Sequence, residues 1–522
     1  MKKILKGIGG LLLHAAVLLV VLLNKYCIDM NETAVMIGAA VWLGLLQLWY
    51  RKRTKDRNGK MTALKRVALI VTDVMIYALL FLFVLINPYW NGSSGRLDCF
   101  AKQCDGERMI SRKEALEDFE YAMKYLERLH PLTMDGLPAE AEEKAQQVRK
   151  ELSERESIPT YELSRELESV FALFDDGHTH LDEDWAEMHY MKYNYEMKKA
   201  GYTIVGINGE RLEDFLKNHP GLVSYETESY GIRLLKTRIS TLEGLRYLGI
   251  DTSGEMTYNY ISEDGAPFDL AVTAADYLIL DEVYDYVEAK LGEDLRTADE
   301  SDDEKGFVYY EIDEENSLAV LTLNECDYNS VYRNTLAEMF QEVAEKGIRN
   351  VAVDLRSNSG GSSLVADEFI NYLDTETYKD WACEWRMHYF LVPYEQSVCT
   401  NRQKENVFDG NVYVLTSVFS YSAAMDFAML IQDNGLGTIV GEPCGNLPSS
   451  YGEIVRYRLP NSGIYMQIST KAWHRVDTSK EGLPILPDIE CPAGEALEKV
   501  MECCNTQPDV SVTAQVQRGE GR

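Results

Sequence analysis

The stretch "NVYVLTSVFSYSAAMDFAMLIQDNGLGTIVG", residues 411–441, decides the fold that the sequence predicts. It opens with a short apolar strand, passes through a polar elbow into an amphipathic helix that ends at Gly435, and closes with a second strand. Strand, helix and strand in this order predict a βαβ unit. Ser422 lies where the elbow becomes the helix. Its hydroxyl could cap the helix, or it could be a nucleophile beside unpaired backbone amides.

Strands and helices alternate over residues 307–504, which predicts an α/β domain there. The segment NVAVDL, residues 350–355, is typical of a strand buried in a parallel sheet. A helix capped by Ser330 is expected to end at Gly347. A late hairpin is expected to turn at residues 460–463.

The sequence before this domain divides into three further segments. Residues 105–194 repeat apolar residues at helical spacing, beginning at Ser111, and predict a helical N-terminal region. Residues 195–291 contain strand patterns and a hairpin around residues 263–265, and predict a β-rich segment. Residues 292–306 are acidic and predict a solvated linker, while the polar residues 505–522 predict a disordered tail.

Residues 1–88 contain three apolar runs, at about 8–24, 33–50 and 67–87, each close to the ~20 residues that a bilayer-spanning helix needs. We therefore expect a membrane anchor of three transmembrane helices. The first run follows MKKILK and resembles a signal peptide when taken alone, but no small-residue cleavage site follows it.

Basic residues predict the orientation of this anchor. The loop RKRTKDRNGKMTALKR, residues 51–66, is strongly basic, as is the N-terminus, so both are expected in the cytoplasm. Three spans then place the rest of the chain outside, which predicts a multi-pass protein of the cell membrane with an extracytoplasmic domain. The net charge of −32 argues against a nucleic-acid partner.

The segment VDLRSNSGGSS, residues 353–363, ends an apolar strand in two glycines. Gly360 and Gly361 permit positive φ and close approach of a ligand, and two successive amides in such a turn can hold an anion. An ordinary turn that connects a strand to a helix would show the same sequence pattern.

The segment LFDDGHTHL, residues 173–181, places two histidines beside a glycine. Histidine is the side chain best suited to accept a proton near neutral pH, which makes His178 and His180 candidates. A weak metal site or a plain surface loop is the alternative, and His474 is the main rival. No Cys pair or His/Cys cluster has the spacing of a zinc site, so we expect no metal.

These segments together resemble the tail-specific, or C-terminal processing, serine peptidases, in the branch that includes the tricorn core. The shared motifs are DLRSNSGG, SYSAAMDFA at the nucleophile helix, TIVGEPCGN behind it, YTIVGINGERLEDFL in a PDZ-like strand and GLPILPDIE near the end. They occur in the family's order over roughly residues 110–500. The resemblance implies ClpP/crotonase-like β-α units in a catalytic domain and a PDZ-like segment at 195–291.

The resemblance also implies the roles of individual residues. The bacterial Ser-Lys relatives carry their base lysine where this chain has Asn446. The tricorn-like branch uses a histidine from the helical region and a glutamate six residues before the Pro of a Pro-Asp pair, which match His178 and Glu481. The implied triad is Ser422, His178 and Glu481. The implied oxyanion hole is formed by Gly360, Gly361 and Ala423.

The sequence therefore predicts a membrane-anchored serine peptidase that hydrolyses extracytoplasmic polypeptides without a cofactor. Its expected partners are a polypeptide substrate and the lipid bilayer, and no feature indicates an oligomeric state. One alternative is a non-catalytic peptide- or ligand-binding protein on the same fold. Another is a Ser-Lys peptidase that uses a displaced lysine, Lys471 or Lys480.

Overall fold

The computed structural model describes residues 104–182, 185–296, 306–387 and 390–506, together with Val41, Trp42, Gly44, Leu48 and Val74. The rest of the expected membrane anchor, residues 297–305 of the expected linker and residues 507–522 of the expected tail lie outside the described residues.

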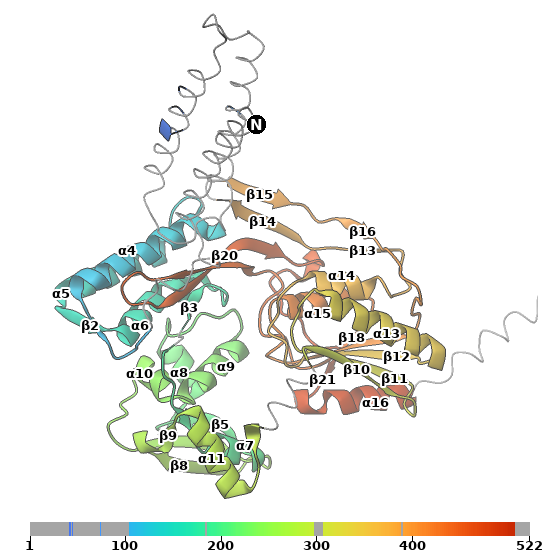
Figure 1. The fold of residues 1–522 in the computed structure, drawn as a ribbon, viewed down its shortest axis with the longest axis horizontal. Coiled ribbons are helices and arrows are strands. Elements are labelled where there is room, and N and C mark those ends of the chain that lie inside the picture. The colour runs from blue at the N-terminus through green and yellow to red at the C-terminus, as the bar shows by residue number, and fades with distance from the viewer. Residues whose placement is uncertain are drawn as a thin grey trace, which may run out of the picture.

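A six-stranded sheet organises the domain that carries Ser422 (Figure 1). The strand order is β10-β11-β12-β17-β18-β21, with β10 antiparallel to β11 and the other neighbours parallel. The strands are β10 (Val308–Asp313), β11 (Leu318–Leu323), β12 (Asn350–Asp354), β17 (Asn411–Thr416), β18 (Thr438–Gly441) and β21 (Ile489–Glu490). The expected mixed α/β architecture is confirmed.

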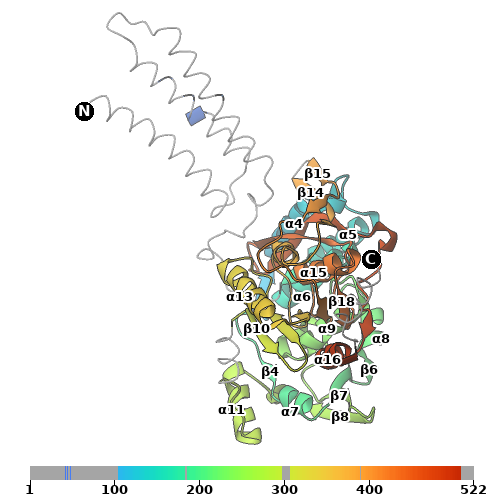
Figure 2. The same cartoon turned by 90° about the vertical axis from the view of Figure 1, so that its right-hand side faces the viewer.

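Helices cover both faces of this sheet. One face carries α13 (Ser330–Lys346), α14 (Leu364–Ile370) and α15 (Ala423–Asp433), and the other carries α16 (Ala496–Thr506) (Figures 1 and 2). Strand β17 shows why both faces are apolar: Val412 and Val414 pack into the core under α15, whereas Tyr413 and Leu415 pack into the core under α16.

The N-cap of α13 differs from the expected Ser330. Asn329 is the capping residue, because its side chain accepts hydrogen bonds from the amides of Val331 and Tyr332, and Ser330 is the first residue of the helix. Both side chains can cap a helix, and the extended backbone at Asn329 selects it.

The helical N-terminal region packs onto a hairpin of the Ser422 domain. Its helices are α4 (Arg112–Leu129), α5 (Ala139–Glu154) and α6 (Thr160–Phe171), with a capping box from Ser111 to Glu114 at the start of α4. The hairpin consists of β19 (Tyr451–Arg458) and β20 (Tyr465–His474), and its apolar face shares one core with these helices. The turn at 460–463 is as expected.

A short strand fastens the histidine loop to the same hairpin. β3 (His180–Asp182) pairs antiparallel with β20, with His180 opposite Gln467. The other neighbours of β20 in this sheet are β19 and β14 (Ala382–Met387), and β14 also pairs with β15 (Phe390–Tyr394). Small ribbons are formed by β1 (Met109–Ser111) with β2 (Ser157–Pro159), and by β13 (Thr377–Lys379) with β16 (Val398–Thr400).

The β-rich segment forms a four-stranded sheet in the order β6-β5-β7-β8, around its own core. Its strands are β5 (Thr203–Ile207), β6 (Glu210–Arg211), β7 (Met256–Ile261) and β8 (Pro267–Val272), and the expected hairpin joins β7 to β8. The neighbouring helices are α7 (Asn194–Lys199), α8 (Leu212–Asn218), α9 (Glu228–Ile239), α10 (Leu242–Tyr247) and α11 (Leu280–Leu291), and α11 also contacts the two-stranded pair β4 (Tyr190–Met191) and β9 (Tyr277–Leu278).

No helix among the described residues is long and apolar enough to cross a bilayer. The longest of them, α4, has 18 residues and alternates charged with apolar positions, whereas a span needs about 20 mostly apolar residues. This finding contradicts the expected anchor of three transmembrane helices, the lipid bilayer as a partner and the multi-pass membrane location. Apart from the five isolated positions, the three apolar runs lie outside the described residues.

Candidate active site

Ser422 occupies a strained elbow at the start of α15. Its backbone has φ 55° and ψ −123°, a conformation that is costly for a residue with a side chain. Although Ser422 is the N-cap of α15, its side chain makes no capping hydrogen bond. The hydroxyl is therefore free of the structural role that the sequence left open.

The amides around Ser422 have different partners. The Ser422 N–H donates to the Asn446 side chain over 2.8 Å, so the residue at the lysine position of Ser-Lys relatives holds the elbow in place. The Ala423 N–H has no hydrogen-bond partner in the described structure. This amide remains available at the positive end of the helix dipole.

The Gly360-Gly361 turn lies directly against the elbow. A Cβ on Gly360 would come within 2.7 Å of the Ser422 Cβ, and both glycines have φ above +100°. The Gly360 N–H donates to the side chain of buried Asn358 over 2.8 Å, whose backbone oxygen accepts the Tyr421 N–H. The Gly361 N–H has no partner among the described residues. Of the three expected oxyanion donors, the amides of Gly361 and Ala423 are thus unoccupied and that of Gly360 is committed to the turn.

His178 is buried in the wall of the same cleft. The cleft has a volume of about 970 Å³, and Ser422, Ala423, Gly361 and His178 all line it. The Nε2 atom of His178 is buried and has no hydrogen-bond partner, and no hydrogen bond joins His178 to Ser422. Burial lowers the pKa of His178 to about 4, against the attraction of Asp176, so the imidazole is neutral at pH 7.

Asp176 supplies the negative charge beside this imidazole. Its Oδ1 lies 3.7 Å from His178 Nδ1 and accepts the His178 backbone N–H. Its Oδ2 lies 3.3 Å from Nε2 of His130, whose Nδ1 accepts the Leu132 N–H. Burial opposes ionisation of Asp176, but the hydrogen bond from His130 and the neighbouring histidines lower its pKa to about 2.

Glu226 is a second carboxyl group near His178. Its Oε1 lies 3.9 Å from His178 Nδ1 and has no hydrogen-bond partner, while its Oε2 accepts the Tyr421 hydroxyl over 3.3 Å. The same hydroxyl lies 3.4 Å from His178 Nδ1. Burial, with repulsion from Asp176, raises the pKa of Glu226 well above its usual range, which favours the protonated form of this carboxyl group.

Donor atoms of Asp176, His178 and Glu226 lie within 4.8 Å of one another, as they would around a cation. Both Asp176 oxygens already accept hydrogen bonds, and the raised pKa of Glu226 disfavours its charged form. The group is therefore better suited to positioning the imidazole than to holding a metal ion.

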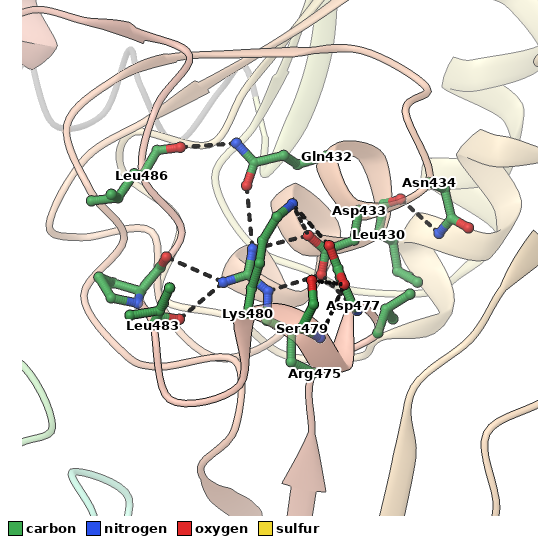
Figure 3. Close-up of polar contacts among 12 residues, drawn as sticks. Leu430, Gln432, Asp433, Asn434, Arg475, Asp477, Ser479, Lys480, Leu483 and Leu486 are labelled. Carbon is green, nitrogen blue, oxygen red and sulfur yellow. Dashed lines mark hydrogen bonds and ion pairs between the residues drawn. The ribbon is translucent and has the colours of Figure 1, made fainter.

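Glu481 follows Lys480 in the chain, and Figure 3 shows Lys480 and Arg475 in contact with Asp433 at the far end of α15. Buried Arg475 binds both oxygens of buried Asp433 over 2.9 Å, and Lys480 also contacts Asp433. Asp433 is the last residue of α15 and Ser422 precedes its first, which separates them by about 16 Å along the axis. Half-exposed Glu481 lies 3.8 Å from His474 Nδ1, so the structure does not bring it to His178.

Lys471 and Lys480, the two lysines of the Ser-Lys alternative, are both paired with carboxylates, so neither is available as a base. Lys471 lines the cleft, but it pairs with Glu453 over 2.8 Å and lies over the rings of Trp385 and Trp473. Lys480 is occupied by Asp433 and Asp477. His180 lines the cleft, where its Nδ1 contacts the Gly177 carbonyl and orients the loop.

The sequence of this domain matches a known peptidase family. Residues 317–491 match peptidase family S41. This part of the chain is a peptidase family S41 domain. The match confirms the expected enzyme class, a serine-type peptidase. The range covers β11 to β21 and includes Gly360, Gly361 and Ser422, whereas His178 and Glu226 precede it.

Solved structures are similar over a longer range. Mature CPAF aligns with a TM-score of 0.52 and 15% identity, over 76% of this chain and 99% of that one. Mature CPAF complexed with lactacystin gives the same TM-score with 13% identity, over the same shares. The photosystem II D1 C-terminal processing protease aligns over 75% of this chain and 98% of that one, with a TM-score of 0.41 and 12% identity. At these identities the likeness to CPAF shows a shared fold.

Sequence reasoning missed four residues that surround His178. Asp176 stands two positions before it, in a segment already singled out, and this proximity was the available signal. His130 ends α4, Glu226 precedes α9 and Tyr421 precedes the elbow serine. No local pattern marks these three, because only the packing of distant segments brings them to the imidazole.

Proposed function

We propose that Ser422 is the nucleophile and His178 the general base of this peptidase. The observation that carries the proposal is the unpartnered Nε2 of a neutral, buried histidine in the wall that also carries the strained elbow serine. A serine hydroxyl is a poor nucleophile at pH 7 without a base within reach. Tightening of this pair on substrate binding is ordinary behaviour for a site without substrate.

The surroundings of His178 support one protonation state. With its ring proton on Nδ1, the imidazole faces Asp176 and the Tyr421 hydroxyl, and it presents the lone pair of Nε2 to the serine. After proton transfer, the ionised Asp176 stabilises the imidazolium, which then delivers the proton to the leaving amine. Asp176 takes the place in this proposal that the family resemblance gave to Glu481.

The Gly361 and Ala423 amides are proposed to hold the oxyanion. Both belong to the cleft wall and neither has a partner in the described structure. The Gly360 amide shapes the turn through Asn358 and is not one of the donors. Preorganised donors of this kind account for a large share of the rate in acyl transfer.

The proposed substrate is an extended segment of polypeptide. Residues Tyr451–Ile454 of β19 line the cleft, and among the described strands β19 pairs with β20 alone. Its other edge therefore offers backbone donors and acceptors to a substrate strand. Processing of polypeptide tails and peptide binding by the PDZ-like segment are part of the same proposal, on the strength of the motifs in residues 110–500.

Labelling with a fluorophosphonate tests the nucleophile and the base. We expect labelling of the full chain, loss of labelling in Ser422→Ala and strong reduction in His178→Ala. His474→Ala is the matched control, because that histidine is half exposed beside Glu481 and should leave labelling unchanged. Full labelling of His178→Ala would remove the proposed base, and absence of labelling in the unaltered chain would favour the non-catalytic alternative.

A further inference from the structure

An acidic side chain without a partner lines the cleft one helical turn beyond the nucleophile. Asp426 is in the first turn of α15, and its backbone N–H donates to the Ser422 carbonyl over 2.9 Å. Its carboxylate is partly buried and forms no hydrogen bond or ion pair with any described residue. The charged form of a carboxyl group is costly when it is removed from water without a partner, and a cation from outside the chain would offset that cost.

No cationic side chain of the described cleft wall pairs with Asp426. The charge that acts on its pKa is that of another acid, Asp380, whose side chain accepts the Trp381 N–H. The cations of the cleft wall are engaged elsewhere, since Lys471 pairs with Glu453 and Arg456 donates to Gln467. Burial, with the charge of Asp380, raises the pKa of Asp426 to about 7, as expected for a carboxyl group that lacks a counter-ion.

Apolar and aromatic groups complete the surroundings. Met425, Leu364 and Trp381 line the same cleft as Asp426. The charge of Asp426 also acts on Cys326, whose carbonyl oxygen lies against Gly361, so this carboxylate is near the oxyanion turn. A long aliphatic stem that ends in a positive charge matches such a lining, because its methylenes can contact the apolar wall and its cation the acid and the indole face.

We propose that Asp426 selects a basic residue, Lys or Arg, on the substrate at the position whose carbonyl Ser422 attacks. That side chain is attached to the Cα atom next to the carbonyl carbon, so placing the carbonyl oxygen between the Gly361 and Ala423 amides would bring the side chain close to this wall. The inference rests on the proposed function, since it needs Ser422 as the nucleophile.

Peptidyl diphenyl phosphonates test this selection on the full chain. One reagent carries lysine at the reacting position and the other norleucine, which has the same stem without the ammonium group. We expect the lysine reagent to inactivate the enzyme at least about tenfold faster, as a charge-assisted contact in a partly buried site implies. In Asp426→Asn the ratio should fall to about one, while the rate with norleucine stays the same within about threefold, because the nucleophile is untouched.

A matched control and two contrary results complete the test. Asp214→Asn makes the same change at an exposed helix position and should keep the preference of the unaltered chain. Equal rates with both reagents in the unaltered chain, or a lysine preference that survives Asp426→Asn, overturn the inference while Ser422 remains the nucleophile. No reaction with either reagent, together with no fluorophosphonate labelling, overturns the proposed function and this inference with it.

Discussion

Asp176 Oδ1 lies 3.7 Å from His178 Nδ1, and Glu226 Oε1 lies 3.9 Å from the same nitrogen. Two carboxyl groups thus flank one imidazole at nearly equal distance. Their pKa values are shifted in opposite directions, because the hydrogen bond from His130 favours the ionised form of Asp176 whereas burial favours the protonated form of Glu226.

This difference predicts unequal effects of removing the two carboxyl groups. Asp176→Asn deletes the charge that stabilises the imidazolium, and we expect kcat to fall on the order of 10²- to 10⁴-fold. Glu226→Gln replaces a neutral acid by a neutral amide of similar shape and should retain most of the activity. Steady-state kinetics on a cleavable peptide measures both. A larger loss in Glu226→Gln than in Asp176→Asn would contradict these assignments.

The buried position of His178 predicts an unusual pH profile. A base must be neutral to accept a proton, and burial lowers the pKa of His178 to about 4. The value of kcat/KM should therefore stay constant as the pH falls below 6.5 and decline only as the pH approaches about 4. A pH–rate profile on the free enzyme checks this. A decline centred near pH 6.5 would indicate an exposed histidine as the base.

Gly360 is predicted to tolerate no side chain. A Cβ there would meet the Ser422 Cβ at 2.7 Å and the Tyr421 carbonyl oxygen at 2.9 Å, and its φ is +110°. Because a displacement of about 1 Å at the nucleophile can cost 10²-fold in rate, Gly360→Ala should lose at least about that much activity. Gly254→Ala, where the added methyl group meets nothing within 4 Å, is the control and should behave as the unaltered chain. Equal activity of the two variants would place Ser422 elsewhere.

Glu481 is predicted to be dispensable for the chemistry. It is half exposed beside His474, and its loop is fastened to the far end of α15. Glu481→Gln should leave kcat and fluorophosphonate labelling unchanged. If kcat instead falls as far as in Asp176→Asn, substrate binding must bring this loop to His178, and the family's triad assignment would hold for this chain.

The Arg475–Asp433 pair is predicted to contribute strongly to stability. Both side chains are almost fully buried, at 2% and 0% exposed, so removing Arg475 leaves the buried Asp433 charge with only the partly exposed Lys480 as its cation. Arg475→Met should lower the free energy of unfolding by about 3–5 kcal/mol. Lys480→Met removes a 42%-exposed contact to the same Asp433 and should cost less than about 1 kcal/mol. Denaturant unfolding compares them, and equal losses would refute the ranking.

Much of the domain around Ser422 is predictable because its signals are local. The alternation of NVYVLT, the elbow and the following helix requires only neighbouring residues to be interpreted, and the structure places strand and helix there. The N-cap of α13 was misplaced by one residue, since Asn329 and Ser330 are both suitable caps and only the backbone conformation distinguishes them.

The environment of the base could not be predicted in the same way. Glu226 and Tyr421 are separated by 195 positions and meet because the start of α9 packs on the elbow, where Tyr230 of α9 stacks on Tyr421. Glu481 was predicted from its spacing to Pro487. Spacing carries no information about buried Arg475, which holds the loop through the Leu483 carbonyl. Apolar composition was the guide for the membrane anchor, and no described helix meets the requirements of a span.

Strand β3 adds to β20 only after both have been made, and Gln467 stands opposite His180. A ribosome that has released the histidine loop must still translate almost 300 codons before the partner strand emerges. During that interval His178 has been synthesised, but the strand that holds its loop beside the cleft has not. Any activity that needs this loop in place therefore cannot begin before the hairpin has been translated.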